Sequence, residues 1–325
     1  MTKRTMVEAI RHALFQEMER DESVVVLGED VGVDGGVFRV TEGLLDEYGE
    51  ERVIDTPLAE SVIAGASTGM AMRGMRPVCE MQFSGFSYYA LAQLENHSAR
   101  LRWRSRGNLS VPMVVRMPYG GGVRALEHHS ESKEVFYAHI PGLKMVIPSG
   151  PRTARALLAS AIRDPDPVVF FEPKLLYRSV KEDVPDEEET MEIGRSRIVR
   201  EGSDLTMISY GAMLGRALDA AEALAEDGVE AEVIDLLTLS PLDAGPFTES
   251  TRRTGRVVIV HEAHRSFGPA GEIAFRILED SFWYLEAPIE RVTGYDVHVP
   301  FFAREQQYLP DVGRIVAAAR RCLDA

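Results

Sequence analysis

Short apolar runs that alternate with helical stretches constrain the fold of this chain more than any other feature of its sequence. The runs are bounded by turn residues, and the stretches between them place apolar side chains at helical spacing. This alternation is typical of buried parallel strands joined by crossover helices. In the first half of the chain the expected strands are residues 24–27, 78–83, 113–117, 144–147 and 168–171, and the expected helices include 59–75 and 153–163.

The N-terminal segment predicts an amphipathic helix. Thr5 is followed three positions later by Glu8, which is the pattern of a capping box. Met6, Ile10 and Leu14 then fall on one helical face.

An acidic segment separates this first alternation from a second one. Acidic residues crowd positions 182–192 around Pro185, which indicates a solvated linker. The alternation beyond it predicts a smaller parallel sheet covered by helices. Its expected strands are 205–210, 231–236, 257–260 and 289–293, and its expected helices are 213–226, 242–251, 271–280 and 312–323.

These patterns predict an α/β fold with two doubly wound parallel-sheet domains. A chain of 325 residues exceeds the roughly 250–300 residues at which a single hydrophobic core stops growing. The expected domains are residues 1–180 and 196–325, joined by an acidic linker at 181–195.

Composition narrows the class of protein. The chain is 45% hydrophobic and 27% charged, and no stretch approaches the roughly 20 apolar residues that cross a bilayer. Charged residues interrupt the N-terminus where a secretion signal needs an apolar core, and the 2 cysteines are too few for a disulfide framework. A formal charge of -15 would repel a phosphate backbone. We therefore expect a cytoplasmic protein that binds neither membrane nor nucleic acid.

Glu60 is the first candidate for chemistry. It closes the segment Asp55-Thr-Pro-Leu-Ala-Glu60, which leads from a short apolar run into a helix. Ligands of open α/β sheets gather at the carboxyl ends of strands, where a glutamate at the start of the next helix could meet one. An acidic residue in the first turn also complements the helix dipole, and on the pattern alone that structural role is the more common one.

Two further segments place functional residue types after strands. Gln82 and Phe86 follow an expected strand, where an amide and an aromatic ring could hold a ligand ring, although core packing explains the aromatics equally well. The glycines of residues 119–122 permit close backbone approach and lead into His128 and His129, which could transfer protons near neutral pH. The histidine pair is a weak candidate for a metal site, because no carboxylate or cysteine has ligand spacing.

Three other motifs are better explained by structure than by chemistry. Residues 28–32 follow a strand but lack the G-x-G-x-x-G of a dinucleotide site and the lysine of a P-loop. His261-Glu-Ala-His264 is one residue shorter than the H-E-x-x-H of zinc proteases. The arginines of residues 100–106 indicate ion pairing at a subunit interface rather than nucleic-acid binding, because the chain is acidic.

Taken together and in this order, the motifs resemble the β subunit of the 2-oxoacid dehydrogenase E1 component, a transketolase-like family that includes the pyruvate and branched-chain 2-oxoacid dehydrogenases. The resemblance covers nearly the whole chain. It implies a thiamine diphosphate pyrimidine-binding domain followed by a transketolase C-terminal-like domain. Besides the segments above it includes residues 27–32, 36–38, 102–105, 143–148, 166–174 and 285–294.

The resemblance implies roles for single residues. Glu60 matches the glutamate that hydrogen-bonds N1′ of the cofactor aminopyrimidine, and Phe86 matches the aromatic residue that packs on this ring, with Gln82 beside it. His129 matches a histidine that orients the 2-oxoacid or assists acyl transfer to lipoamide. A structural potassium (K⁺) site, built largely from backbone carbonyls, is matched by Met113, Ala161, Ile162, Asp164 and Asp166.

One motif of thiamine diphosphate enzymes is missing. These enzymes hold Mg²⁺ and the diphosphate with Gly-Asp-Gly followed by Asn, and the chain has no Gly-Asp-Gly. In this family the motif belongs to the α subunit. The resemblance therefore implies a cofactor shared with an E1 α subunit in an α2β2 heterotetramer, and a chain that is inactive alone.

The sequence departs from the family pattern at three points. It has Ala92-Gln93 where Asp-Gln is frequent, Glu131 where the family commonly has glutamine, and Leu237 where arginine usually follows Asp-Leu. The first and third departures concern positions that the resemblance places at subunit interfaces. Glu131 adds a negative charge that could affect the protonation of His129 or weaken the binding of an anionic 2-oxoacid.

The leading functional expectation is oxidative decarboxylation of a 2-oxoacid, pyruvate or branched-chain, with acyl transfer to the lipoamide of the E2 acyltransferase. The nearest enzymatic alternative is an acetoin dehydrogenase β subunit. A noncatalytic α/β subunit that only stabilises a partner is the alternative from another class. The substrate stays open, because much of its pocket is expected from the α subunit.

Overall fold

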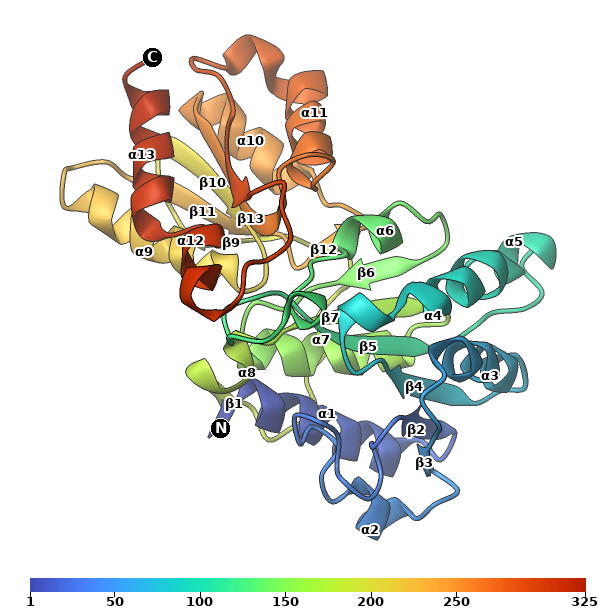
Figure 1. Cartoon of the computed structure of the whole chain (residues 1–325). Helices are drawn as coiled ribbons and strands as arrows, with labels where there is room; N and C mark the ends of the chain where they lie inside the picture. The colour runs from blue at the N-terminus through green and yellow to red at the C-terminus, as the bar shows by residue number, and fades with distance from the viewer. The chain divides into compact units, whose positions relative to one another are not determined.

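The computed structural model describes residues 1–325, which divide into two compact units. The first unit comprises Met1–Tyr119 and Phe136–Ile193, and the second comprises Gly120–Val135 and Gly194–Ala325. Each unit has its own sheet with helices around it (Figure 1). The predicted fold class, two doubly wound α/β domains, is confirmed.

The sheet of the first unit is parallel. Its strands are β2 (Val24–Gly28), β3 (Val53–Asp55), β4 (Arg76–Glu80), β5 (Val114–Tyr119), β6 (Lys144–Val146) and β7 (Val168–Pro173). They lie in the order β6-β7-β5-β4-β2-β3, and each neighbouring pair is parallel. Every residue of β5 and β7 is buried, so the sheet is covered on both faces.

Helices of the first unit pack in two pairs (Figure 1). One pair is α1 (Met6–Arg20) with α7 (Pro151–Arg163), and the other is α3 (Glu60–Met72) with α4 (Tyr88–Gln93). The predicted capping box of α1 is confirmed, because Thr5 and Glu8 each accept the main-chain N–H of the other. The shorter elements are α2 (Leu44–Tyr48), α5 (Leu101–Arg104), α8 (Leu176–Ser179) and a π-helical turn, Leu94–Ser98.

The acidic segment that was expected as a solvated linker has structure of its own. β8 (Lys181–Val184) pairs antiparallel with β1 (Thr2–Thr5). After β8, two arginines of α7 form ion pairs with carboxylates of the acidic segment. Arg152 lies 2.6 Å from Glu189, and Arg163 lies 2.9 Å from Glu188. Composition reveals the charges of such a segment but not the distant arginines that pair with them.

The second unit holds a smaller sheet. Its strands are β9 (Arg197–Arg200), β10 (Leu205–Ser209), β11 (Ala231–Asp235), β13 (Val257–His264) and β14 (Glu290–Gly294), in the order β14-β13-β10-β11-β9. The four expected strands are parallel, whereas β9 is an antiparallel edge strand. The expected parallel sheet is thus extended at one edge by an antiparallel strand that was not predicted. β9 is short and partly exposed, so no continuous apolar run marks it in the sequence.

The four expected helices of the second unit are present. α9 (Met213–Ala225) packs with α13 (Val312–Leu323), and α10 (Gly245–Thr254) packs with α11 (Ala270–Ser281) (Figure 1). No helix of the chain combines the length and apolar character needed to span a bilayer. Further short elements of the chain are α6 (Glu134–Ala138), β12 (Thr238–Ser240), α12 (Glu305–Tyr308) and the 3₁₀ turns Phe282–Tyr284 and Phe302–Arg304.

Candidate active site

Polar residues follow three neighbouring strands of the first unit, at the edge of the sheet where these strands have their carboxyl ends. β3, β2 and β4 are adjacent and parallel, so their carboxyl ends lie together. Glu29 directly follows β2, Gln82 follows β4, and Glu60 begins the helix after β3. This is the edge at which open α/β sheets bind ligands.

Glu60 is the first residue of α3 and is half-buried. Ala59 before it offers no capping side chain, so the carboxylate of Glu60 complements the positive end of the helix dipole. Gln93 of α4 donates from its amide to Ser61 Oγ at 3.2 Å. The start of α3 is therefore held in place by a second helix.

Glu29 and Asp30 share this edge with Glu60. Burial raises the pKa of Glu29, and the negative charges of Asp30 and Glu60 raise it further. Gln82 donates from Nε2 to Asp30 Oδ2 at 3.1 Å, which joins it to the acidic cluster. The sequence pattern explains residues 28–32 by structure alone and does not identify Glu29 and Asp30 as candidate site residues. Their position directly after a strand was the available signal.

The loop after β2 closes over the end of β3 through Asp55. The main-chain N–H groups of Gly32 and Val33 donate to the two oxygens of Asp55 at 2.6 and 3.0 Å. A Cβ on Gly32 would lie only 2.8 Å from this carboxylate. A side chain at position 32 would therefore displace the Asp55 carboxylate from its present position.

Phe86 ends a 3₁₀ turn, Ser84–Phe86, and is half-buried. Its ring meets Phe83 edge-on at a centroid distance of 5.5 Å, and Phe83 meets Phe38 in the same way at 5.5 Å. Ser87 stabilises the turn by donating to Ser84 O at 2.6 Å. Phe83 thus belongs to the core, whereas Phe86 keeps an exposed part that could meet a ligand ring.

A buried ionic network holds the end of β4, directly before the loop that contains Gln82. Arg116 on β5 donates to Glu80 at 2.7 Å and to both oxygens of Glu172 at 2.7 and 3.0 Å. Tyr177 donates its hydroxyl to Glu172 at 2.6 Å. Burial raises the pKa of Glu80, although Arg116 acts in the opposite direction. Because Glu80 is the last residue of β4, the network sets where the loop begins.

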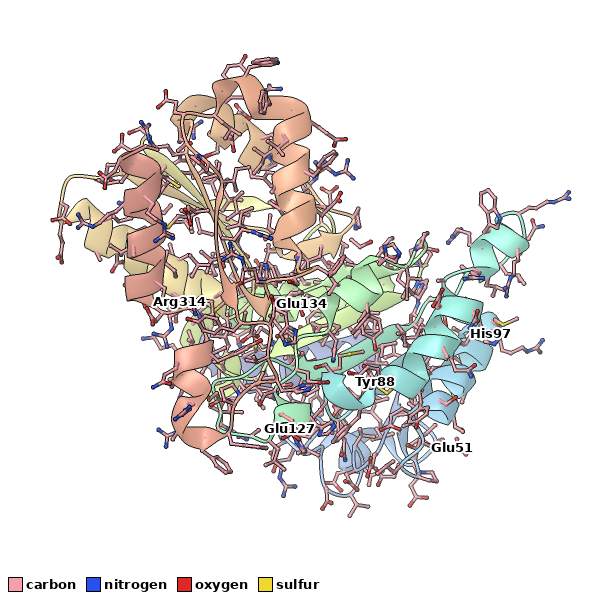
Figure 2. The ribbon with its side chains drawn as sticks, turned by 45° about the horizontal axis from the view of Figure 1, so that its top comes forward. Glu51, Tyr88, His97, Glu127, Glu134 and Arg314 are labelled. Atoms are coloured by element: carbon pink, nitrogen blue, oxygen red, sulfur yellow. The ribbon has the colours of Figure 1, made fainter.

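His129 belongs to the second unit, where it ends a 3₁₀ turn, Glu127–His129 (Glu127 is labelled in Figure 2). Its main-chain N–H donates to Leu126 O at 3.0 Å, and Gly120 N–H donates to Glu131 O at 3.2 Å. The second bond joins the two ends of a compact loop, residues 120–131, which we call the histidine loop. The extra charge of Glu131 is offset locally, because Lys133 lies 3.2 Å away.

Glu134, which is labelled in Figure 2, follows the histidine loop and is completely buried. Tyr210 donates its hydroxyl to Oε1 at 2.8 Å, while Oε2 has no hydrogen-bond partner. Burial raises the pKa of this carboxyl. Glu134 can therefore retain its proton at a higher pH than an exposed glutamate.

His261 and His264 lie on β13 rather than on a helix. His261 is buried, its Nε2 accepts from Ala270 N–H at 3.3 Å, and burial lowers its pKa to about 3. It is therefore neutral near pH 7. No group of three or more histidine, cysteine or acidic side chains in the chain is arranged to hold a metal ion.

Most residues expected around potassium gather at the carboxyl end of α7. The carbonyls of Ala161 and Ile162 belong to its last turn, where the helix dipole attracts a cation. Ile162 O accepts from Arg76 at 2.8 Å, and the Asp164 carboxylate accepts from Lys144 at 2.6 Å. A set of oxygen donors suits a hard cation. In the structure the side chains of Arg76 and Lys144 already donate to two of these residues.

Oxygens of the other two residues expected around potassium already accept hydrogen bonds. Asp166 lies 2.5 Å from the guanidinium of Arg102, and Met113 O accepts from Val168 N–H at 2.9 Å. Each of these oxygens can accept a second contact. Potassium binding therefore stays a prediction that this geometry permits.

The arginine-rich stretch lines a hollow of about 1300 Å³ on the first unit. Trp103 in its wall is 88% exposed, and Arg100 pairs with Glu95 at 3.2 Å. Exposed tryptophan among arginines is typical of protein contact surfaces. The expected subunit interface stays a prediction.

The sequence matches two protein-family models. Residues 2–180 match the transketolase pyrimidine binding domain, and residues 194–315 match the transketolase C-terminal domain. A split-gene transketolase described as an inactive β4 tetramer has a similar structure, with a TM-score of 0.79, 22% identity and coverage of 98% of each chain. At that identity the likeness supports the fold alone. Fold and family models together define a transketolase-like protein.

Bacterial relatives narrow this class. The chain is 48% identical over 324 residues to the pyruvate dehydrogenase E1 component subunit beta of Bacillus subtilis, covering 100% of both chains. It is 47% identical over 321 residues to the same subunit of Acholeplasma laidlawii, covering 99% of this chain and 98% of the relative. The chain belongs to the family of pyruvate dehydrogenase E1 component β subunits, which confirms the resemblance seen in its motifs.

Proposed function

We propose that this chain is the β subunit of a thiamine diphosphate-dependent E1 enzyme that oxidatively decarboxylates pyruvate. It would transfer the acyl group to a lipoyl group on an E2 acyltransferase. The observation that carries the proposal is Glu60, which begins α3 at the carboxyl edge of the sheet in a chain that matches E1 β subunits from end to end.

Glu60 supplies a carboxylate for the pyrimidine end of the cofactor. Thiamine diphosphate, when bound, supplies the electron sink that loss of CO₂ from a 2-oxoacid requires. Glu60 would hydrogen-bond N1′ of the aminopyrimidine, beside Glu29, whose pKa is raised by burial and by the charges of Asp30 and Glu60. Phe86 would pack on the same ring, and Gln82 would be oriented for it by Asp30.

His129 supplies a polar group for the substrate. The histidine loop holds it in a closed 3₁₀ turn. There it would orient the 2-oxoacid or assist acyl transfer to lipoamide.

A partner subunit completes the proposed site. Because the chain has no Gly-Asp-Gly motif, an E1 α subunit would hold Mg²⁺ and the diphosphate in an α2β2 heterotetramer. The hollow around Trp103 and its arginines offers one contact surface for such an assembly. Potassium at the end of α7 would be structural, and a reducing cytoplasm would suit the two free thiols.

Co-expression with the E1 α subunit encoded in the same genome tests this function. The purified complex should reduce a dye acceptor with pyruvate, and only when thiamine diphosphate and Mg²⁺ are present. Either subunit alone should be inactive. Turnover of acetoin but not of pyruvate would support the acetoin dehydrogenase alternative, and a stable complex inactive on every substrate would support the noncatalytic one.

A further inference from the structure

The histidine loop begins with a backbone shape that binds anions. Gly120, Gly122 and Arg124 have positive φ angles of 81°, 97° and 58°, and the residues between them do not. Alternation of left-handed with ordinary backbone directs successive N–H groups toward one side and forms a concave anion site. Arg124 carries a side chain in this unfavourable region, so its surroundings must stabilise it.

The anion at this backbone comes from the same unit. Glu305, at the start of α12, accepts the Gly122 N–H on Oε1 at 2.9 Å and the Arg124 N–H on Oε2 at 2.8 Å. Each carboxylate oxygen therefore accepts one main-chain donor. Glu305 is completely buried, so water does not compete for these charge-assisted bonds.

Glu262 on β13 supports the beginning of the loop. Its Oε2 lies 3.4 Å from the Gly121 nitrogen, which donates to it. A Cβ on Gly120 would overlap the Glu262 carboxylate. The first residues of the loop thus lie tightly against two glutamates from the C-terminal part of the chain.

Arg314 holds the segment that carries Glu305. From α13 its guanidinium donates to the carbonyls of Tyr308 and Leu309 at 3.3 Å each, and to Thr293 O at 2.6 Å. Figure 2 labels Arg314 at the start of α13. Glu305 therefore projects from a turn that is tied to β14 and is not free to follow the loop.

We propose that Glu305 is the positioning residue of the histidine loop. Its carboxylate clamps residues 122–124, and the bond between Gly120 and Glu131 transmits this restraint to the part of the loop that contains His129. The catalytic consequence rests on the proposed role of His129, whereas the clamp itself rests only on the geometry. Glu305 would not touch the substrate.

Glu305→Gln in the α2β2 complex tests the clamp, with Glu222→Gln on the exposed face of α9 as the matched control. A glutamine side chain accepts only on its carbonyl oxygen, because its NH₂ group is a donor and cannot accept the second main-chain N–H. Amide hydrogen exchange should become about tenfold faster in peptides covering residues 120–131 and stay unchanged in α9. The control should exchange like the wild type.

Steady-state kinetics test the consequence for catalysis. We expect Glu305→Gln to lower kcat with pyruvate about ten- to a hundredfold, while the affinity for thiamine diphosphate stays within about twofold. Glu305→Asp keeps both acceptors and should recover part of the rate and of the exchange protection. If Glu305→Gln does not fold, Glu305→Asp alone should still show an intermediate increase in exchange.

Three results have distinct meanings. Unchanged exchange in residues 120–131 of Glu305→Gln would overturn the clamp. Faster exchange with an unchanged kcat, in an enzyme that His129→Ala inactivates, would overturn the positioning role. Faster exchange in an enzyme that His129→Ala leaves fully active would support the clamp and contradict the proposed function of His129.

Discussion

Gln82 donates a hydrogen bond from Nε2 to Asp30 Oδ2 at 3.1 Å, between the loops that follow the adjacent strands β4 and β2. The bond commits the NH₂ group of the amide to Asp30, so the carbonyl oxygen of Gln82 faces another direction and can accept from a ligand. It also joins an expected cofactor residue to an acidic cluster that contains Glu29 and Glu60.

Asp30→Ala should weaken cofactor binding by releasing Gln82. The loss of one hydrogen bond costs about 1–1.5 kcal/mol, which corresponds to about tenfold in affinity. The measurement is the apparent Kd for thiamine diphosphate in the reconstituted complex. Asp34→Ala, on the exposed part of the same loop, is the matched control. Equal affinities of the two variants would show that the bond does not orient Gln82 for the cofactor.

Arg116→Met should destabilise the first unit strongly, because it leaves Glu80 and Glu172 buried without their cation. Breaking such a network from one side costs about 3–5 kcal/mol. Urea unfolding of the complex measures the loss, and Arg73→Met on the exposed end of α3 is the control. The triple variant that adds Glu80→Gln and Glu172→Gln should recover part of the stability. No recovery would mean that the cost is one of packing rather than of unpaired charge.

Protonation of His261 should oppose folding of the second unit at low pH. Its folded pKa of about 3 lies below the unfolded value of about 6.5. Between these values the unfolded chain binds a proton that the folded chain excludes, so stability present above about pH 6.5 declines as the pH falls. The contribution lost by about pH 5 is about 2 kcal/mol.

The variant His261→Gln isolates this titration. Its unfolding free energy should fall less between about pH 7 and about pH 5 than that of the wild type, whatever the cost of the substitution at neutral pH. His298→Gln, at an exposed histidine, should follow the wild-type pH dependence. Parallel pH profiles for the wild type and His261→Gln would contradict the assignment of His261 as a buried neutral group.

Potassium should stabilise the first unit if it binds at the end of α7. A ligand at a hundredfold excess over its Kd adds about 2.7 kcal/mol to the folded state. Calorimetry should therefore give a higher Tm in potassium chloride than in sodium or choline chloride of equal ionic strength. Asp164→Ala should reduce this difference. Equal Tm values in all three salts would indicate that Arg76 and Lys144 satisfy these oxygens without a bound ion.

The sequence revealed the regular elements well and the supporting contacts poorly. The strands around Val26 and Ile208 are continuous apolar runs, and the capping box of Thr5 is local, so each could be read directly. β9 and β8 could not, because short polar strands depend on partners that lie far away in the chain.

The candidate site shows the same division. Glu60, Gln82 and Phe86 could be proposed because they follow strands and because the ordered motifs resemble those of a known family. Glu305 could not, since its role depends on a bond to a residue 183 positions away. Asp30 also follows a strand, but nothing local in the sequence shows its bond to Gln82, 52 positions away. Periodicity carries no information about such distant pairings.

The proposed role of Glu60 is tested most directly by Glu60→Gln in the reconstituted α2β2 complex. The substitution keeps the size of the side chain but removes the exchangeable carboxyl proton. The account predicts a folded complex whose pyruvate-dependent dye reduction falls at least about a hundredfold, whereas Glu22→Gln, at an exposed glutamate, behaves like the wild type. Wild-type dye reduction by Glu60→Gln would contradict the assignment of Glu60 to the catalytic site.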